Sequence, residues 1–391
     1  MRLSKLLFSI AAISAFLFIG CQKDITKDEQ RSSSRTSSSV NEATKKRLAE
    51  IRASLPKDYK DRIKLNAPIL IQTHPEYREM IMRILKVAEA TECDPDTDLF
   101  VWLNDQLADW NSEVIFYALI TGMLDFPTYD ALLFENSSAD QYFGVNGEYT
   151  QRLTKTFKDL KRFWNIQSQG IIMVGMHGNM LLDRDRVIRI DMVLYGDDKP
   201  TAEYWADLIL QLLDIFPQYR NGDHPIFTFN SFAQPAFNFP PYGRIPDKVV
   251  MGDGILDGFT ALGYEDVAPQ AVLAHEYGHQ VQFQLGVFSN GTPESTRRTE
   301  LMADALSAYY LSHARGASMQ WKRVKEFLAV FFNIGDCEFT SSGHHGTPLQ
   351  RMAAAEWGYH LTDDAQKQGH ILTAQKFLTL FNAALPGILA Q

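Results

Sequence analysis

Short apolar runs separated by turn residues occupy the middle of the chain. The runs at residues 171–176, 187–195 and 226–232 each predict a β-strand. Residues 201–216 carry apolar side chains at helical spacing and predict a helix between the second and third runs. A further run at residues 246–254 predicts a short strand that is closed by a glycine-containing turn.

Helical periodicity dominates the part of the chain before these strands. Residues 41–54, 75–91 and 97–110 show apolar positions at helix-type spacing. Turn-forming aspartate and proline residues separate the last two of these segments. The pattern predicts a mainly helical N-terminal region at residues 41–165.

Two longer helices are predicted after the strands. The first runs through residues 269–285, from a proline that favours a first helical turn to Gly286, which can end the helix. The second begins between residues 295 and 299 and continues to residue 315, before Gly316. Strands followed by paired helices indicate an α+β domain over residues 166–391.

The first of these helices contains the sequence His275-Glu276-Tyr277-Gly278-His279. Residues four apart lie on one face of an α-helix, so the two histidines can direct ring nitrogens at one point about 2 Å away, as a catalytic zinc ion requires. Glu276 lies beside that point, where a carboxylate can act as general base for a zinc-activated water. An HExxH sequence arises by chance in roughly one chain in a hundred of this length, so the motif needs support.

An acidic pair on the second helix supplies this support. Glu300 and Asp304 are also four residues apart, and requiring such a pair lowers the chance expectation to roughly one chain in a thousand. Glu300 can reach the metal only if the two helices approach closely, and Gly278 beside the histidine face permits such an approach. Asp304 would then accept a hydrogen bond from the free ring N–H of a histidine ligand and fix its tautomer.

Together the two motifs resemble those of the gluzincin zinc metallopeptidases, which combine HExxH with a downstream ExxxD helix. The resemblance covers about residues 245–360 and implies a zincin-like catalytic domain, with a small sheet and paired active-site helices. It also implies one Zn²⁺ ion per chain and hydrolysis of peptide bonds, most simply by an endopeptidase. By this resemblance, His275, His279 and Glu300 would be the zinc ligands and Glu276 the general base. Asp304 would accept a hydrogen bond from one of the histidine ligands.

A later loop-like segment, residues 335–346, contains further candidates. Gluzincins often supply a histidine, sometimes oriented by an aspartate, to stabilise the oxyanion of the tetrahedral intermediate. His345 resembles that histidine, and Asp336 resembles its partner. His344 is an alternative to His345, and a solvent-facing loop without a catalytic role is an equally good interpretation of the segment.

A strand edge above the zinc helix binds the substrate backbone in the same enzymes. Residues 246–254 resemble that strand in position, and an ordinary structural strand fits them equally well.

Composition fits a globular protein with an acidic balance. The chain has 391 residues, of which 45% are hydrophobic and 22% charged, enough to bury a core in one large or two ordinary domains. Its formal net charge of −9 becomes −11 once Arg2 and Lys5, two cations near the N-terminus, are removed. An acidic chain without a basic cluster argues against nucleic acid as a partner.

The first residues have the pattern of a bacterial lipoprotein signal peptide. Arg2 and Lys5 precede an apolar run at residues 6–19, which is too short for a comfortable transmembrane helix. The run leads into Cys21 in a sequence that resembles a lipobox, so residues 1–20 would be removed and Cys21 lipidated. Several acyl chains on one cysteine give stable anchoring, because each buried CH₂ adds about 0.8 kcal/mol.

Residues 21–40 are serine-rich, polar and without apolar periodicity, which predicts a flexible tether. No aspartate directly follows Cys21; by resemblance this favours the outer membrane, and the Lys-Asp pair that comes next hints at exposure on the cell surface. The expected location is therefore the cell envelope, with the membrane as a partner through the lipid. Cleavage by an ordinary signal peptidase, which leaves a Cys21 thiol, is the alternative.

Two further cysteines, Cys93 and Cys337, fit a disulfide or two buried thiols equally well.

The sequence as a whole predicts a membrane-anchored zinc metallopeptidase that acts on a peptide or protein outside the cytoplasm. Two other classes remain open. One is a catalytically silent binding lipoprotein that keeps zinc for stability; an intact Glu276 argues against it, because a structural zinc site needs no base and is usually closed by four protein ligands. The other is an envelope assembly factor in which the motif is accidental.

Overall fold

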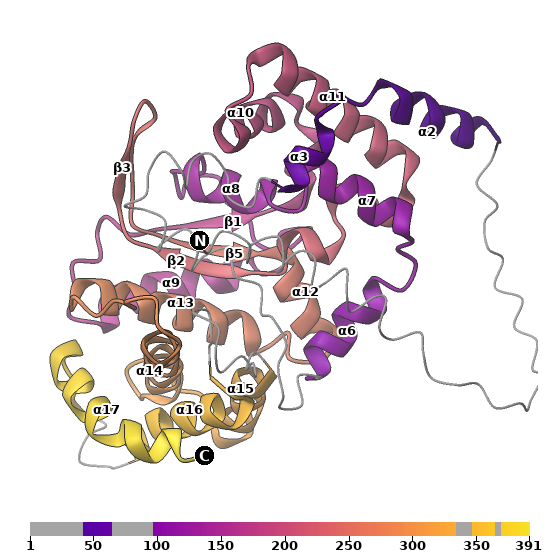
Figure 1. Cartoon of the computed structure of the whole chain (residues 1–391). Coiled ribbons are helices and arrows are strands. Elements are labelled where there is room, and N and C mark those ends of the chain that lie inside the picture. Colours follow the sequence, from indigo (N-terminus) through magenta and orange to yellow (C-terminus); the bar gives the residue numbers. More distant parts are fainter. Residues whose placement is uncertain (1–41, 65–96, 334–345, 364–368) are drawn as a thin grey trace, which may run out of the picture.

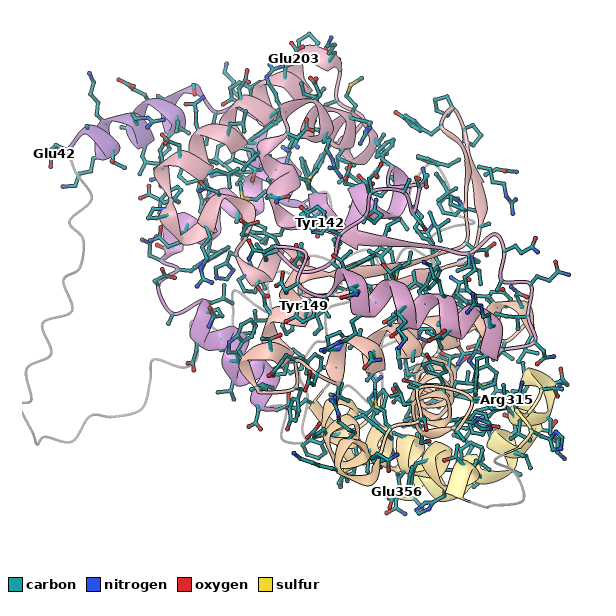
Figure 2. The ribbon with its side chains drawn as sticks, turned by 180° about the vertical axis from the view of Figure 1, so that it is seen from behind. Glu42, Tyr142, Tyr149, Glu203, Arg315 and Glu356 are labelled. Atoms are coloured by element: carbon teal, nitrogen blue, oxygen red, sulfur yellow. The ribbon has the colours of Figure 1, made fainter. Side chains whose placement is uncertain are left out.

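A small mixed sheet separates two layers of helices, as Figure 1 shows. Helices predominate, so the α+β prediction is confirmed in its broad form. Figure 2 shows the molecule from behind, with Glu203 of one layer and Glu356 of the other at opposite ends. The computed structural model describes residues 42–64, 97–333, 346–363 and 369–391.

The strand order in the sheet is β1-β5-β2. The central strand β5 is parallel to β1 and antiparallel to β2, and a separate hairpin pairs β3 with β4. Side chains alternate between the two faces of a strand, so Val250 enters the core above the sheet, whereas Val249 and Met251 enter the core below it. The strands are β1 (Ile172–Met176), β2 (Ser231–Gln234), β3 (Phe237–Phe239), β4 (Gly243–Ile245) and β5 (Lys248–Gly252).

The upper layer covers the face of the sheet to which Val250 points. Its core is rich in aromatic residues, among them Tyr117, Trp205 and Tyr219. The α-helices of this layer are α2 (Glu42–Ser54), α3 (Tyr59–Lys64), α7 (Ser112–Thr121), α8 (Phe126–Leu133), α10 (Arg184–Tyr195) and α11 (Lys199–Ile215). Three short 3₁₀ helices connect its elements: η2 (Gly178–Leu182), η3 (Pro217–Gly222) and η4 (Pro225–Thr228).

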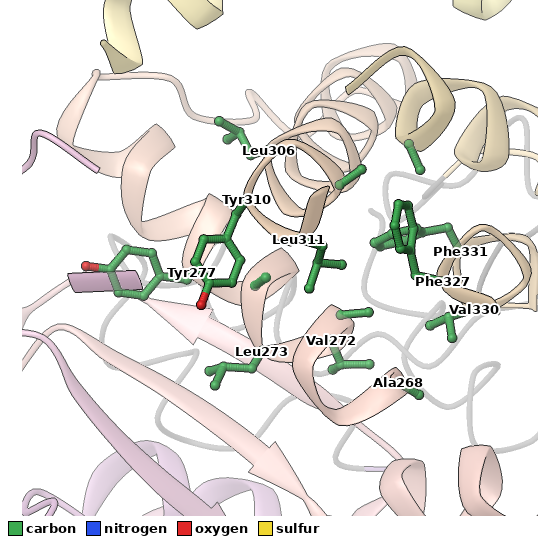
Figure 3. Packing of buried hydrophobic residues seen from close by; sticks show 14 of the residues in the cluster. Ala268, Val272, Leu273, Tyr277, Leu306, Tyr310, Leu311, Phe327, Val330 and Phe331 are labelled. Carbon is green, nitrogen blue, oxygen red and sulfur yellow. The ribbon is translucent and has the colours of Figure 1, made fainter. Parts of the chain in front are cut away.

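The lower layer covers the opposite face and contains both predicted motif helices, α13 and α14. Figure 3 shows side chains of these two helices, such as Val272 and Leu311, beside those of α15, such as Val330. The helices of this layer are α6 (Asp98–Gln106), α9 (Thr150–Phe163), α12 (Asp253–Ala261), α13 (Ala268–Gln284), α14 (Pro293–Ser312), α15 (Trp321–Asn333), α16 (Pro348–Asp363) and α17 (Ala374–Leu389).

The predicted strand at residues 187–195 is wrong, because this segment belongs to helix α10. Asp183 caps the helix by accepting hydrogen bonds from the backbone N–H groups of Asp185 and Arg186, and Gly196 ends it in the left-handed conformation. The apolar residues bury one face of the helix at helical spacing, with charged residues between them. The dense apolar run hid this period in the sequence.

The predicted strand at residues 226–232 is wrong over most of its length. Its first part forms the 3₁₀ helix η4, which Pro225 starts and the His224 side chain caps by accepting a hydrogen bond from the Ile226 N–H. Strand β2 begins only at Ser231. Proline at a first helical position was the signal against a strand here.

The remaining predicted strand and helices that fall on described residues are present. The strand at 171–176 corresponds to β1, the helix at 201–216 to α11, and the two motif helices to α13 and α14, although α14 ends at Ser312 rather than at residue 315. Strand β5 occupies residues 248–252 of the segment predicted at 246–254 and is paired on both sides, whereas the predicted closing turn is wrong, because Asp253 and Gly254 begin helix α12. The strand therefore cannot add a substrate strand, and the ordinary structural interpretation is the correct one.

The helix predicted at residues 75–91 lies outside the described residues. The lower core joins residues from both sides of residue 165, such as Phe157 of α9 and Tyr277 of α13, whose rings meet edge to face 6.0 Å apart. The division at residue 165 stays a prediction.

Candidate metal centre

Helix α13 presents the first motif in a buried position between the sheet and α14. Its small residues allow this arrangement, because a Cβ atom added to Gly278 would lie only 3.2 Å from the Ala303 Cα on α14. Ser307 of α14 also donates a hydrogen bond to the Ala271 carbonyl, at 2.9 Å. Close contact between the two helices, predicted from Gly278, is therefore confirmed.

A buried glutamine fixes α13 against the sheet beside the motif. The side-chain amide of Gln280 donates to the backbone carbonyls of Gln234 and Lys248, each at 2.9 Å. These two residues are partners in the β2–β5 ladder. His279, the neighbour of Gln280, is thereby held near the start of β5.

Three side chains from the two helices converge on one point. The Nε2 atoms of His275 and His279 lie 3.2 Å apart, and the Glu300 carboxylate oxygens lie 3.3 Å from the first and 3.5 Å from the second. Most direct N–H···O bonds are shorter, near 2.9 Å. Ligands at about 2.0–2.1 Å from a tetrahedral zinc ion are separated by about 3.3 Å, so the observed spacing matches the edges of such a site.

The ring orientation of His275 is set by a buried carboxylate and a buried guanidinium. Its Nδ1 lies 2.8 Å from the Asp304 carboxylate, to which it donates. Arg351 of α16 donates to both oxygens of Asp304, at 2.7 and 2.8 Å, and is itself only 2% exposed. With its proton on Nδ1, neutral His275 directs the lone pair of Nε2 at the point of convergence.

The ring of His279 is oriented by a second relay. Its Nδ1 lies 3.0 Å from the Gln282 side-chain oxygen, and the Gln282 amide nitrogen donates to the Thr299 carbonyl at 2.6 Å. Since a carbonyl can only accept, Thr299 fixes which end of the Gln282 amide faces the imidazole. His279 therefore also keeps its proton on Nδ1 and its Nε2 lone pair toward the same point.

The described side chains of the centre carry more negative than positive charge. Among them Glu276, Glu300 and Asp304 face one cation, Arg351, so with neutral histidines two negative charges are in excess. Burial lowers the pKa of His275, but the hydrogen bond to Asp304 and the nearby glutamates outweigh this effect and raise it to about 10. A cation at the point of convergence, either a proton or a metal ion, is therefore strongly favoured.

Glu276 lies beside the two histidines and farther from their ring nitrogens than Glu300 does. One of its carboxylate oxygens lies within 4.8 Å of the ring nitrogens of His275 and His279, whereas the oxygens of Glu300 are closer. None of the hydrogen bonds formed among the described residues involves the Glu276 carboxylate. Burial raises the pKa of this carboxyl group, so it is more ready to accept a proton than an exposed glutamate.

Several predicted functional residues fall outside the described part of the chain. These are the oxyanion candidates His344 and His345, their possible partner Asp336, the lipidation site Cys21, and the cysteines Cys93 and Cys337. Among the described residues, an aromatic ring lies beside the histidines. The ring of the fully buried Phe331, near the end of α15, lies 6.5 Å from that of His275.

Sequence reasoning missed two residues that orient the histidines, Arg351 and Gln282. Gln282 lies three positions after His279 on the same helix, which is a spacing that allows side-chain contact and was therefore detectable. Arg351 is remote in sequence, and its only signal is a single arginine within the apolar pattern of α16. The tyrosines Tyr309 and Tyr310 of α14, in contrast, lie in the core.

No family model, no curated protein and no solved structure matches this chain. Function is therefore inferred from the arrangement of side chains on α13, α14 and α16.

Proposed function

We propose that the protein is a zinc-dependent peptide hydrolase, with one zinc ion bound by His275, His279 and Glu300. The observation that carries the proposal is the convergence of two imidazole Nε2 atoms and one carboxylate, 3.2–3.5 Å apart, with both rings oriented from behind by acceptors. Lone pairs and negative charge directed at one buried point repel one another unless a cation lies between them.

The donor set suits zinc in a catalytic role. Two imidazoles and one carboxylate are the ligands of several catalytic zinc sites, which leave a fourth position for water or substrate. Structural zinc sites are usually closed by four protein ligands, most of them cysteines. The excess of two negative charges around the site also equals the charge of the ion.

The protein side of the reaction follows from the placement of Glu276. Zinc in this site would supply Lewis acidity, which activates water and polarises a carbonyl. Glu276 would take the proton of the attacking water and deliver it to the leaving amine. Asp304 and Gln282 would hold the two histidine rings in the required tautomers throughout.

These features support the earlier resemblance to the gluzincins. The histidines and Glu300 come from two helices in close contact, and Asp304, one turn beyond Glu300, contacts His275 as the motif implies. His345 as an oxyanion-stabilising residue remains part of the proposal. We propose peptides or proteins as the substrate class and no role in nucleic-acid binding.

The test is the variant Glu276→Gln, which removes the base and keeps the size of the side chain. Zinc measured by mass spectrometry should remain at one per chain, while digestion of casein or of a peptide library should fall at least about a hundredfold. The matched control is Glu356→Gln, an exposed glutamate on α16 that points away from the body (Figure 2). Unchanged turnover in Glu276→Gln would exclude the mechanism, and purified protein without zinc would exclude the metal.

We further propose that the protein is anchored to the cell envelope through a lipid on Cys21. Among the described residues, no helix is long and apolar enough to cross a bilayer. Metabolic labelling with an alkyne fatty acid should mark the wild-type protein and not Cys21→Ser, in which the acceptor thiol is removed. Labelling of both proteins would contradict the assignment of Cys21.

A further inference from the structure

A row of aromatic rings leads from the metal centre to the surface. Phe283 lies one turn after His279 on α13, and the two rings are nearly parallel at 6.4 Å. Phe288, in the loop that follows, stacks on Phe283 with ring centroids 5.6 Å apart and planes 12° apart. The row therefore continues the helix face that carries both histidines.

The turn after α13 holds Phe288 in this position. Gly286 adopts the left-handed conformation at φ 70°, and the Val287 N–H returns to the Gln282 carbonyl at 2.9 Å. The loop is then tied to α14, because the hydroxyl groups of Ser289 and Thr296 are hydrogen-bonded at 2.7 Å. The same helix, α14, carries Glu300, so the outer ring and a metal ligand share one rigid support.

Phe288 is not used to fill the core. It is 47% exposed, whereas Phe331, which contacts the other side of the centre at His275, is fully buried. A single exposed apolar residue is common on protein surfaces, but this one is fixed by stacking and adjoins the centre. Its ring lies at most about 12 Å from that of His279. At about 3.4 Å per extended residue, this is within reach of a substrate residue three or four positions from the scissile bond.

We propose that Phe283 and Phe288 form a subsite that selects substrates with an aromatic or large aliphatic side chain close to the scissile bond. This inference depends on the proposed peptide hydrolysis and names the substrate class. An apolar side chain laid on the exposed face of Phe288 would lose water from both surfaces, and an aromatic one would add ring stacking. Small or charged side chains at that position would gain neither.

The first experiment compares cleavage of matched peptides that differ only in phenylalanine or alanine at each position around the scissile bond. Zinc-loaded wild type should prefer phenylalanine at one position by about tenfold in kcat/KM, and Phe288→Ala should abolish that preference. Zinc content should stay unchanged. Phe288→Leu should retain a preference for large aliphatic residues.

The matched control is Tyr242→Ala. Tyr242 is 45% exposed and stacks on Phe239 at 5.3 Å, but it belongs to the β3–β4 hairpin and contacts Phe134 of the upper layer. Its removal should leave the cleavage preference intact. If Phe288→Ala cleaves with the same preference as wild type, the subsite is excluded although the hydrolase remains.

A binding experiment separates failure of the subsite from failure of the proposed function. Zinc-loaded Glu276→Gln, with and without Phe288→Ala, is titrated calorimetrically with the phenylalanine and alanine peptides. Tighter binding of the phenylalanine peptide that requires Phe288 supports the subsite even if wild type hydrolyses nothing. Equal binding of both peptides to the Glu276→Gln protein excludes it.

Discussion

The layers above and below the sheet both bury charged side chains, but they neutralise them differently. In the upper layer arginines pair directly with carboxylates: Arg62 contacts Asp191 and Asp197, and Arg186 contacts Asp130 and Glu135. At the candidate metal centre of the lower layer, three carboxylates face one arginine among the described residues, and two imidazole Nε2 atoms face the same point.

Direct ion pairs stabilise a fold and leave fewer charged groups for a ligand to satisfy. In the upper layer Arg62 also lies against the rings of Tyr195 and Trp205, at 3.6 and 4.2 Å. The candidate metal centre reaches a comparable balance of charge only with an added cation.

The largest expected effect comes from removing a proposed metal ligand. Glu300→Gln deletes one of the negative charges that the proposed zinc ion would neutralise, so we expect the loss of stoichiometric zinc and of all measurable hydrolysis. Zinc content and peptide cleavage measure this directly. Glu294→Gln, an exposed glutamate in the first turn of the same helix, should keep both. One zinc per chain in Glu300→Gln would remove Glu300 from the ligand set.

Breaking the charge pairing in the upper layer should destabilise the fold without touching the metal. Arg62→Ala leaves Asp191 buried without its partner, which costs about 3–5 kcal/mol in the free energy of unfolding. Urea denaturation measures the cost, and the protein that remains folded should bind zinc normally. The control is Arg47→Ala, which removes an exposed pair with Asp214 and should cost less than about 1 kcal/mol. Loss of zinc together with stability would show that the layers are coupled.

The proposed metal ligands were predictable because their chemistry is local. The i, i+4 spacing of His275 and His279 places both on one helix face whatever the rest of the fold does. Glu300 and Asp304 repeat that spacing, and Gly278 indicated that the helix carrying them could approach. One face of each helix and one close contact were sufficient to assemble the proposed ligands.

The residues that complete the centre depend on tertiary packing. Arg351 reaches Asp304 only because α16 packs against α14, where Gly358 lies so close that a Cβ atom there would be 2.2 Å from the Ala305 carbonyl oxygen. No periodicity in the sequence pairs α16 with Asp304. The same reason explains α10: its dense apolar run fits a strand or a helix, and the caps at Asp183 and Gly196 decide between them.

A smaller effect is expected from the residue that orients His275. Asp304→Asn keeps a hydrogen-bond acceptor but removes the charge that faces Arg351 and the imidazole, so zinc affinity should fall by about 10- to 100-fold. Competition with a chromophoric chelator measures the affinity. The control is Asp207→Asn, an exposed carboxylate paired with Arg184. Unchanged affinity in Asp304→Asn would mean that the tautomer of His275 is set without this contact.

The smallest expected effect concerns Lys248, a fully buried cation of the upper layer. Its ammonium group donates to the carbonyls of Ala131, Leu132 and Glu135 near the end of α8. Burial lowers its pKa from 10.5 to about 7, against the opposing influence of Glu135. Between these two values the unfolded chain binds more protons than the folded protein, so the free energy of unfolding should rise with pH, by at most about 1.4 kcal/mol per unit.

Comparing wild type with Lys248→Met between pH 7.5 and 9.5 isolates this contribution, because other titrating groups act equally in both proteins. A rising difference in urea stability would show that the upper layer can release a proton from its buried lysine and keep its fold. A flat difference would show instead that the carbonyl groups hold the ammonium form. The two layers would then share one requirement, a permanently buried cation, which the upper layer meets with a lysine and the lower layer with a metal ion.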